Sequence, residues 1–137
     1  MKLKLHHVNL ATTNVAAMDT FYQDVMGLDR ETSGLPVLEK KKGYAGDVAF
    51  VTDGAIQMHL ATKDIHAGFN SGQIVNPVAT GHIAYRCDDI EAFKAHLEEK
   101  GVPYSDWSYQ AVAGWHQIFF YDPDGNVIEV HQVDEDG

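Results

Sequence analysis

The sequence predicts an α+β fold made of two modules, each of which runs strand, helix and then about three strands. Apolar residues at three- and four-residue spacing occur once in each half, and the other apolar segments alternate. The two halves also match by feature. Each first strand carries a histidine, His7 or His82, a glycine follows each helix, and each last hairpin contains Asp-Gly. The repeat indicates an internal duplication, and two copies suggest a pseudo-twofold barrel with a cleft between them.

The first half follows from local signals. A strand is expected over 3–10, where polar and apolar residues alternate. A helix follows over 15–25, capped by Thr13 or Asn14 and ended by Gly27, with an apolar stripe that we expect in the core. The remaining predicted elements are weak strands over 28–33 and 37–41, a loop over 43–46, and a hairpin of strands 47–52 and 55–61.

The second half begins after a Gly- and Asn-rich segment at about 63–78, which is typical of a linker or lid. The predicted elements are a strand over 81–87, a helix from Ile90 closed by Lys100-Gly101, a short strand over 102–107, and a hairpin of 117–121 and 127–132. We therefore expect one domain, 1–137, with module 1 at about 1–62 and module 2 at about 79–133.

The last hairpin carries a chemical signal. In the turn, Pro123 presets φ and Gly125 can adopt a positive φ. Side chains alternate across a strand, so Glu129 and His131 share one face of the return strand. A carboxylate on a buried face needs a partner, and the rest of the chain can supply it.

Composition narrows the function classes. The net charge is −10 with histidine neutral, which argues against nucleic-acid binding. No apolar run approaches the roughly 20 residues of a membrane span. Cys87 is the only cysteine, which excludes an internal disulfide, and we expect it to be buried and unreactive. The N-terminus shows no signal-peptide pattern, so we expect a cytoplasmic protein.

Four stretches resemble the vicinal oxygen chelate superfamily, which includes glyoxalase I, bleomycin-binding proteins, extradiol dioxygenases and fosfomycin thiol transferases. They are 5–10, Phe-Tyr-x-Asp-x-x-Gly-Leu at 21–28, 81–84, and the 119–129 hairpin with Asp-Pro-Asp-Gly-Asn-x-x-Glu. The resemblance spans about residues 3–133. It implies a glyoxalase-like fold in which the two βαβββ modules form a cupped mixed sheet around a metal. The superfamily hosts several reactions, so the resemblance does not select one.

The resemblance implies metal ligands from the first and last strands of each half: His7, Gln57, His82 and Glu129. Two imidazoles and a carboxylate suit Fe²⁺, Mn²⁺, Ni²⁺ or Zn²⁺ and leave open positions. Gln57 is the departure, because glyoxalase I has two glutamates among its ligands. We take Gln57 as equivalent to Glu129, and a neutral amide there predicts weak lactoylglutathione formation and tighter metal binding in Gln57→Glu.

Other residues are candidates for the surroundings of the metal. His59 and His131 are expected beside the ligands, and His6 on the opposite strand face. Trp107, Trp115 and His116 could line a pocket or cover the barrel edge. Arg86 and Lys63 are candidates for holding an anionic group.

The predicted function is a metal-dependent enzyme acting on a small substrate that chelates the metal through neighbouring oxygens. A dioxygenase and a glyoxalase-type lyase or isomerase stay open, with Glu129 as the catalytic carboxylate. A non-catalytic binding protein of the bleomycin type is the alternative, which the metal ligands disfavour. A fosfomycin-type transferase ranks lower, because residues 105–116 lack a basic phosphonate pocket. We expect a homodimer, since short half-barrels leave sheet edges to cover.

Overall fold

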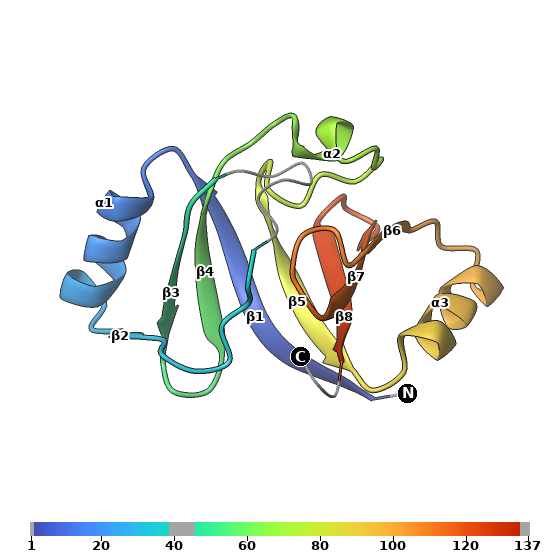
Figure 1. The fold of residues 1–137 in the computed structure, drawn as a ribbon, viewed down its shortest axis with the longest axis horizontal. Helices are drawn as coiled ribbons and strands as arrows, with labels where there is room; N and C mark the ends of the chain where they lie inside the picture. Colours follow the sequence, from blue (N-terminus) through green and yellow to red (C-terminus); the bar gives the residue numbers. More distant parts are fainter. Residues whose placement is uncertain (1, 39–45, 135–137) are drawn as a thin grey trace.

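The architecture is an eight-stranded, curved mixed sheet with its longer helices on the outside (Figure 1). The computed structural model describes residues 2–38 and 46–134. Its elements are β1 (Leu3–Thr12), α1 (Val15–Thr20), a π-helix η1 (Phe21–Val25), β2 (Asp29–Arg30), β3 (Val48–Thr52), β4 (Gln57–Thr62), α2 (Ala67–Asn70), β5 (Gly81–Cys87), α3 (Ile90–Glu99), β6 (Ser105–Ser108), β7 (Trp115–Tyr121) and β8 (Val127–Val133).

The strand order β2-β3-β4-β1-β5-β8-β7-β6 shows the internal duplication directly. In each half the first strand pairs in parallel with the last one, β1 with β4 and β5 with β8. The halves meet through the antiparallel pair β1 and β5 at the centre of the sheet. The predicted α+β fold of two βαβββ units is confirmed, and it puts the first and last strands of both units side by side.

Both α1 and α3 begin at a capping side chain, but the two helices pack differently. The side chain of Asn14 caps α1, and that of Asp89 caps α3 by accepting from the amide of Ala92. In α3, Ile90, Phe93 and Leu97 are buried against β5, β7 and β8. The expected core stripe of the first helix is wrong: α1 and η1 contain no buried residue.

Several predicted boundaries shift. The weak strand at 28–33 shrinks to β2, and 37–41 gives only an isolated bridge between Leu38 and Val112 among the described residues. Residues 39–45 lie outside the described residues, and they include most of the loop predicted at 43–46. Residues 135–137 at the acidic C-terminal end also lie outside them. The segment expected as a linker contains α2, which lies above the central strands in Figure 1. The module boundaries near 62 and 79 remain our prediction.

Candidate metal centre

Three side chains from the central strands converge within the sheet. His7 comes from β1, His82 from β5 and Glu129 from β8, and one ligand atom of each lies within 4.8 Å of the other two. Glu129 Oε1 is 3.0 Å from His82 Nε2 and 3.5 Å from His7 Nε2. All three side chains are buried. The pairing of β1 with β5 and of β5 with β8 therefore brings together three residues that lie up to 122 positions apart in the sequence.

The protonation of these groups fits a divalent cation. His82 Nδ1 lies 2.7 Å from the Pro77 carbonyl, an acceptor, so Nδ1 carries a proton, and Nε2, which faces Glu129 Oε1 at 3.0 Å, is the nitrogen that could bind a cation. Burial alone would raise the pKa of Glu129, but His7, His131 and His82 outweigh it and hold that pKa well below its usual value. Burial lowers the pKa of His7, so its imidazole is neutral. The donor set is thus two imidazoles and a carboxylate, which could hold such an ion.

Glu129 is oriented by a chain of hydrogen bonds behind it. His131, which is fully buried, has its Nδ1 2.6 Å from Glu129 Oε2. Arg86 Nε donates to His131 Nε2 at 3.0 Å, and the Arg86 guanidinium lies 5.0 Å from the ring centre of Trp115. Because arginine only donates, His131 must carry its proton on Nδ1 and give it to Glu129. This hydrogen bond holds Glu129 so that its Oε1 faces His7 and His82. His131 thus lies beside the candidate ligands, where the sequence placed it.

The expected position of His6 is wrong. A register shift between Leu5 and His7 interrupts the pairing of β1 with β5. The irregularity turns His6 to the same side as His7: its ring lies against Trp115 and His131, and its Nδ1 is 2.7 Å from His7 Nδ1. Burial, and after it the charge of Arg86, lowers the pKa of His6 to about 3. His6 therefore belongs to the histidine cluster.

The expected equivalence of Gln57 and Glu129 does not agree with the strand registers. On β4, Gln57 pairs with His7 and His59 with Asn9, whereas Glu129 on β8 pairs with Ala84, two residues beyond His82. If His7 corresponds to His82, the residue that corresponds to Glu129 is His59. The ring contacts agree with this correspondence, because the His59 ring stacks on the His7 ring with their centres 3.8 Å apart.

Gln57 makes other contacts in this structure. Its Nε2 donates to the carbonyls of Ser33 and Gly34, at 3.4 and 3.2 Å. Its Oε1 is therefore the atom that faces His59 Nε2, at 2.7 Å. The amide holds His59 in place rather than pointing at His7, His82 and Glu129. Its role as a metal ligand stays a prediction, and the structure gives His59 the position nearer to the three ligands.

A cavity of about 70 Å³ opens onto the cluster and is lined by His7, His59, His82 and Glu129. Trp107 and Trp115 also line it, which is one of the two positions that the sequence left open, together with Phe119. Leu38 and Val112, which form the isolated bridge between the halves, contribute to its wall.

Two further residues of this cavity escaped the sequence reasoning. Asn9 Oδ1 and Gln117 Oε1 are buried and have no hydrogen-bond partner among the described residues. Unpartnered buried acceptors are costly, so these two oxygens point to a donor supplied by a ligand or by water. The signal available in the sequence was their alternation with His7 and Phe119 on inward strand faces.

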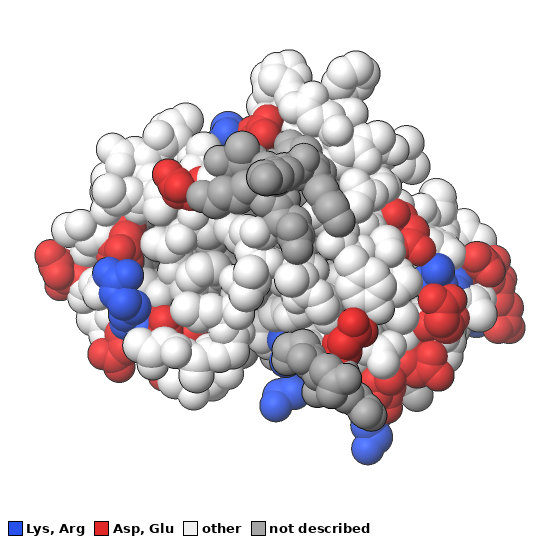
Figure 2. Space-filling model, viewed as in Figure 1, with Lys and Arg blue, Asp and Glu red and all other residues white. Residues whose placement is uncertain are grey.

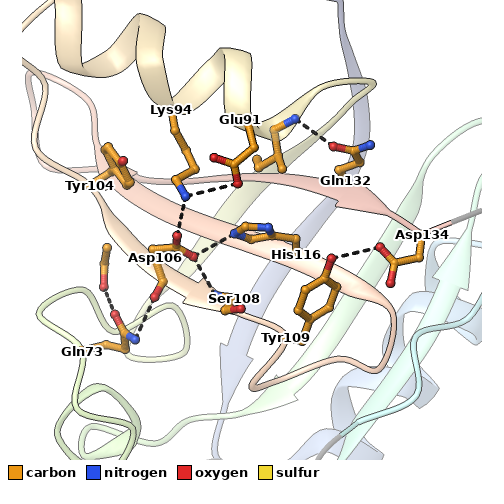
Figure 3. Close-up of polar contacts among 12 residues, drawn as sticks. Gln73, Glu91, Lys94, Tyr104, Asp106, Ser108, Tyr109, His116, Gln132 and Asp134 are labelled. Carbon is orange, nitrogen blue, oxygen red and sulfur yellow. Dashed lines mark hydrogen bonds and ion pairs between the residues drawn. The ribbon is translucent and has the colours of Figure 1, made fainter.

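His116 does not reach the cavity. It alternates with Trp115 and Gln117, so its ring lies on the other face of β7, where its Nε2 is 2.9 Å from Asp106 Oδ1 (Figure 3). Lys94 of α3 pairs with the other oxygen of Asp106 at 2.8 Å. His116 thus helps to join β6 and β7 to α3. Lys63 is exposed and lines neither cavity found among the described residues.

Acidic side chains outnumber basic ones on the face shown in Figure 2. Figure 2 shows acidic side chains gathered at both ends of the face it presents, with few basic side chains among them. None of the helices in residues 2–38 and 46–134 is long and apolar enough to cross a membrane.

Comparison with known proteins shows the superfamily to which the chain belongs. The model of the Glyoxalase/Bleomycin resistance protein/Dioxygenase superfamily matches residues 4–130, so the chain belongs to this superfamily, as its sequence motifs indicated. It is 27% identical over 131 residues to the uncharacterized protein YaeR of Escherichia coli (strain K12), covering 94% of this chain and 95% of that protein. It is 26% identical over 135 residues to glyoxylase I 4 of Arabidopsis thaliana, covering 95% of this chain and 71% of that protein.

Solved structures share the fold at lower identity. The hypothetical protein BH1468 from Bacillus halodurans C-125 matches with a TM-score of 0.73 and 22% identity, over 98% of this chain and 97% of that chain. Methylmalonyl-CoA epimerase from Mycobacterium tuberculosis matches with a TM-score of 0.66 and 17% identity, over 96% and 89%.

Proposed function

We propose that this protein is a divalent-metal-dependent enzyme that acts on a small substrate through two neighbouring oxygens. The observation that carries the proposal is the convergence of His7 Nε2, His82 Nε2 and Glu129 Oε1 at the floor of a cavity. These three residues would hold Fe²⁺, Mn²⁺, Ni²⁺ or Zn²⁺. When bound, the ion would polarise a substrate oxygen as a Lewis acid, and three protein ligands leave positions open for that oxygen.

The walls of the cavity support a compact, polar substrate with an apolar side. Asn9 Oδ1 and Gln117 Oε1 would accept hydrogen bonds from hydroxyl or amide groups of the substrate, which satisfies both oxygens. Trp107 and Phe119 are almost fully buried and would exclude water from the apolar side. A volume of about 70 Å³ fits a few non-hydrogen atoms, so we expect only the reacting end of a larger substrate to enter.

We favour isomerase or lyase chemistry of the glyoxalase type. One relative bears the name of a glyoxylase and one structural neighbour that of an epimerase, and both names belong to this class rather than to oxygen insertion. Glu129 remains the proposed catalytic carboxylate, held in its ionised form with Oε1 facing the cavity floor.

An extradiol-type dioxygenase is the second candidate. The set of two histidines and one glutamate is the facial arrangement of non-haem iron sites, and it is the observation that supports this candidate. A binding protein without turnover is a further alternative, which the first experiment separates. A fosfomycin-type transferase ranks lower, because residues 105–116 lack a basic phosphonate pocket.

Metal content is the decisive measurement. Protein purified without chelator should contain about one metal ion per chain after reconstitution with each of the four ions. His82→Ala should lose this ion and keep its circular dichroism spectrum, whereas His66→Ala, at an exposed position, should retain it. Wild-type protein that binds none of the ions would overturn the proposal and favour the binding protein.

Turnover then separates the reactions. The metal-loaded protein should be assayed for lactoylglutathione formation with Ni²⁺ and Zn²⁺, for epimerisation of a 2-substituted thioester by solvent deuterium exchange, and for oxygen uptake with catechols under Fe²⁺. Deuterium exchange without oxygen uptake would support isomerase or lyase chemistry. Oxygen uptake that is lost in Glu129→Gln would support the dioxygenase.

We also propose a cytoplasmic homodimer. The support is a group of large apolar side chains on the α2 segment, where Ile65, Phe69 and Ile74 are exposed by 68%, 86% and 80%. A second chain would bury them. Light scattering of the wild type should give twice the chain mass at micromolar concentration, and Phe69→Ser should lower it toward one chain.

A further inference from the structure

A second cavity, of about 290 Å³, lies toward the N-terminal end of β1 and shares no lining residue with the first. Among the described residues, its lining includes two cationic side chains, Lys4 from β1 and Arg86 from β5, and the imidazole of His6 from β1. It is several times larger than the space of one water molecule, which is roughly 30 Å³ in the liquid. The cavity thus has room for a small ligand and a concentration of hydrogen-bond donors.

Arg86 has no carboxylate partner among the described residues, although it is half-buried. Its polar contacts are two imidazole nitrogens, His131 Nε2 at 3.0 Å and His6 Nε2 at 3.1 Å. Burial lowers the pKa of Arg86, although the group remains a cation because its ordinary pKa is so high. A guanidinium has five N–H donors, so most of them are left for a partner.

We propose that this second cavity binds a small oxyanion, such as sulfate, phosphate or a short carboxylate, on Arg86 and Lys4. We further propose that a metal ion on His7 strengthens this binding. The second part rests on the metal site proposed above, and the first part does not.

One acidic side chain, Glu31, also lines the cavity but faces its own turn. Its Oε1 accepts from the amides of Thr32 and Ser33 and from the Ser33 hydroxyl. Three local donors therefore already compensate this carboxylate, and no hydrogen bond or ion pair joins it to Arg86 among the described contacts. The cationic donors of the cavity stay available to an incoming anion.

Counting protons on the histidines links the two cavities. Without metal, Arg86 donates to His6 Nε2, so His6 carries its proton on Nδ1 and donates it to His7 Nδ1 at 2.7 Å. His7 then has its proton on Nε2, the nitrogen that faces Glu129. A metal ion needs that nitrogen free, so His7 must carry its proton on Nδ1 instead.

The shift on His7 reverses the hydrogen bond to its neighbour. His7 Nδ1 becomes the donor, His6 Nδ1 the acceptor, and the proton of His6 moves to Nε2. His6 Nε2–H and the N–H of Arg86 then face each other as two donors, 3.1 Å apart, with no acceptor between them. An oxyanion in the second cavity supplies the missing acceptor. By linkage, metal and anion must then strengthen each other's binding by the same factor.

Calorimetry on chelator-treated protein tests the anion site alone, with sodium sulfate and sodium acetate as probes and chloride as the control. One sulfate should bind per chain. Arg86→Gln should weaken it by about tenfold or more, because a charged hydrogen-bond partner is lost. Lys4→Gln should weaken it less, and Lys2→Gln, an exposed lysine outside the cavity, should leave it unchanged. No saturable sulfate binding, or equal binding by wild type and Arg86→Gln with intact circular dichroism, would overturn the site.

Nitrogen-15 spectra of the histidine rings test the link directly, with Zn²⁺ as a diamagnetic probe. The signals of His6, assigned by their loss in His6→Gln, should show the Nδ1–H form in chelated protein and the Nε2–H form with Zn²⁺. Sulfate should bind about fivefold tighter to the zinc form, and Arg86→Gln should remove this gain, which separates the cavity from sulfate held by zinc itself.

Failure of the proposed metal site and failure of the link between the two cavities give different results. Protein that takes up none of the four ions overturns the proposed metal function, while sulfate binding to the chelated form still stands or falls on its own. Protein that binds Zn²⁺ with His6 unchanged overturns the link.

Discussion

Acid should destabilise the metal-free protein through His59, and substitution of this one residue should remove a defined part of the effect. The His59 side chain is 5% exposed, stacked on His7, and hydrogen-bonded through Nε2 to Gln57 Oε1 at 2.7 Å. Burial, and after it the charge of His7, lowers the pKa of His59 well below 6.5. The folded protein therefore keeps this imidazole neutral at mildly acidic pH, where the unfolded chain protonates it.

The sign and size of the effect follow from linkage. Between the lowered pKa of the folded state and pH 6.5, the unfolded state binds more protons, so the free energy of unfolding falls as the pH falls. For an unfolded pKa of about 6.5 and a folded state that stays neutral, the loss between pH 7.5 and 5.5 is about 1.4 kcal/mol. His6 and His7, whose pKa values burial also lowers, add to the slope of the wild type.

Urea unfolding in the presence of chelator measures this loss in wild type and in His59→Gln, which keeps a donor for Gln57 but does not titrate. The free energy of unfolding of the wild type should fall by about 1.4 kcal/mol more than that of the variant between pH 7.5 and 5.5. Between pH 8.5 and 7.5 the two should run in parallel, which is the internal control. Equal slopes from pH 7.5 to 5.5 would show that His59 takes up its proton in the folded state and would refute the reasoning.

Three substitutions test other parts of the structure by urea unfolding at pH 7.5. Gln57→Glu should lower the free energy of unfolding by about 2 kcal/mol, because it sets a buried carboxylate against two backbone carbonyls. The tighter metal binding expected for this variant from the sequence stays a prediction, and a variant as stable as wild type would contradict the contacts described for Gln57. Phe93→Ala should cost about 3–5 kcal/mol, since Phe93 is 5% exposed on the buried side of α3, and a loss below 1 kcal/mol would contradict this packing. Gly81→Ala should destabilise and disturb Asn9, because a Cβ would lie 2.2 Å from the Asn9 carbonyl oxygen at a φ of +106°; a wild-type melting curve would argue against that close approach.

The sequence by itself determined the order of the elements and the main members of the site. Alternation and three- or four-residue spacing depend on neighbours along the chain, so β1, β5, α3 and the last hairpin were predictable. The repeat identified His7 and His82 as corresponding residues, and Glu129 stood out as a carboxylate among apolar strand residues.

The tertiary structure decided what depends on register and on contacts between strands. One irregularity in β1 turns His6 toward the cluster, because a single extra residue reverses which face a side chain takes. The pairing of β4 with β1 puts His59, and not Gln57, at the position that corresponds to Glu129. The stripe on α1 and η1 stayed unburied because an amphipathic pattern states which face is apolar but not whether another element of the chain covers it. Strand register and packing partners are set by residues far apart in the sequence, and no local pattern records them.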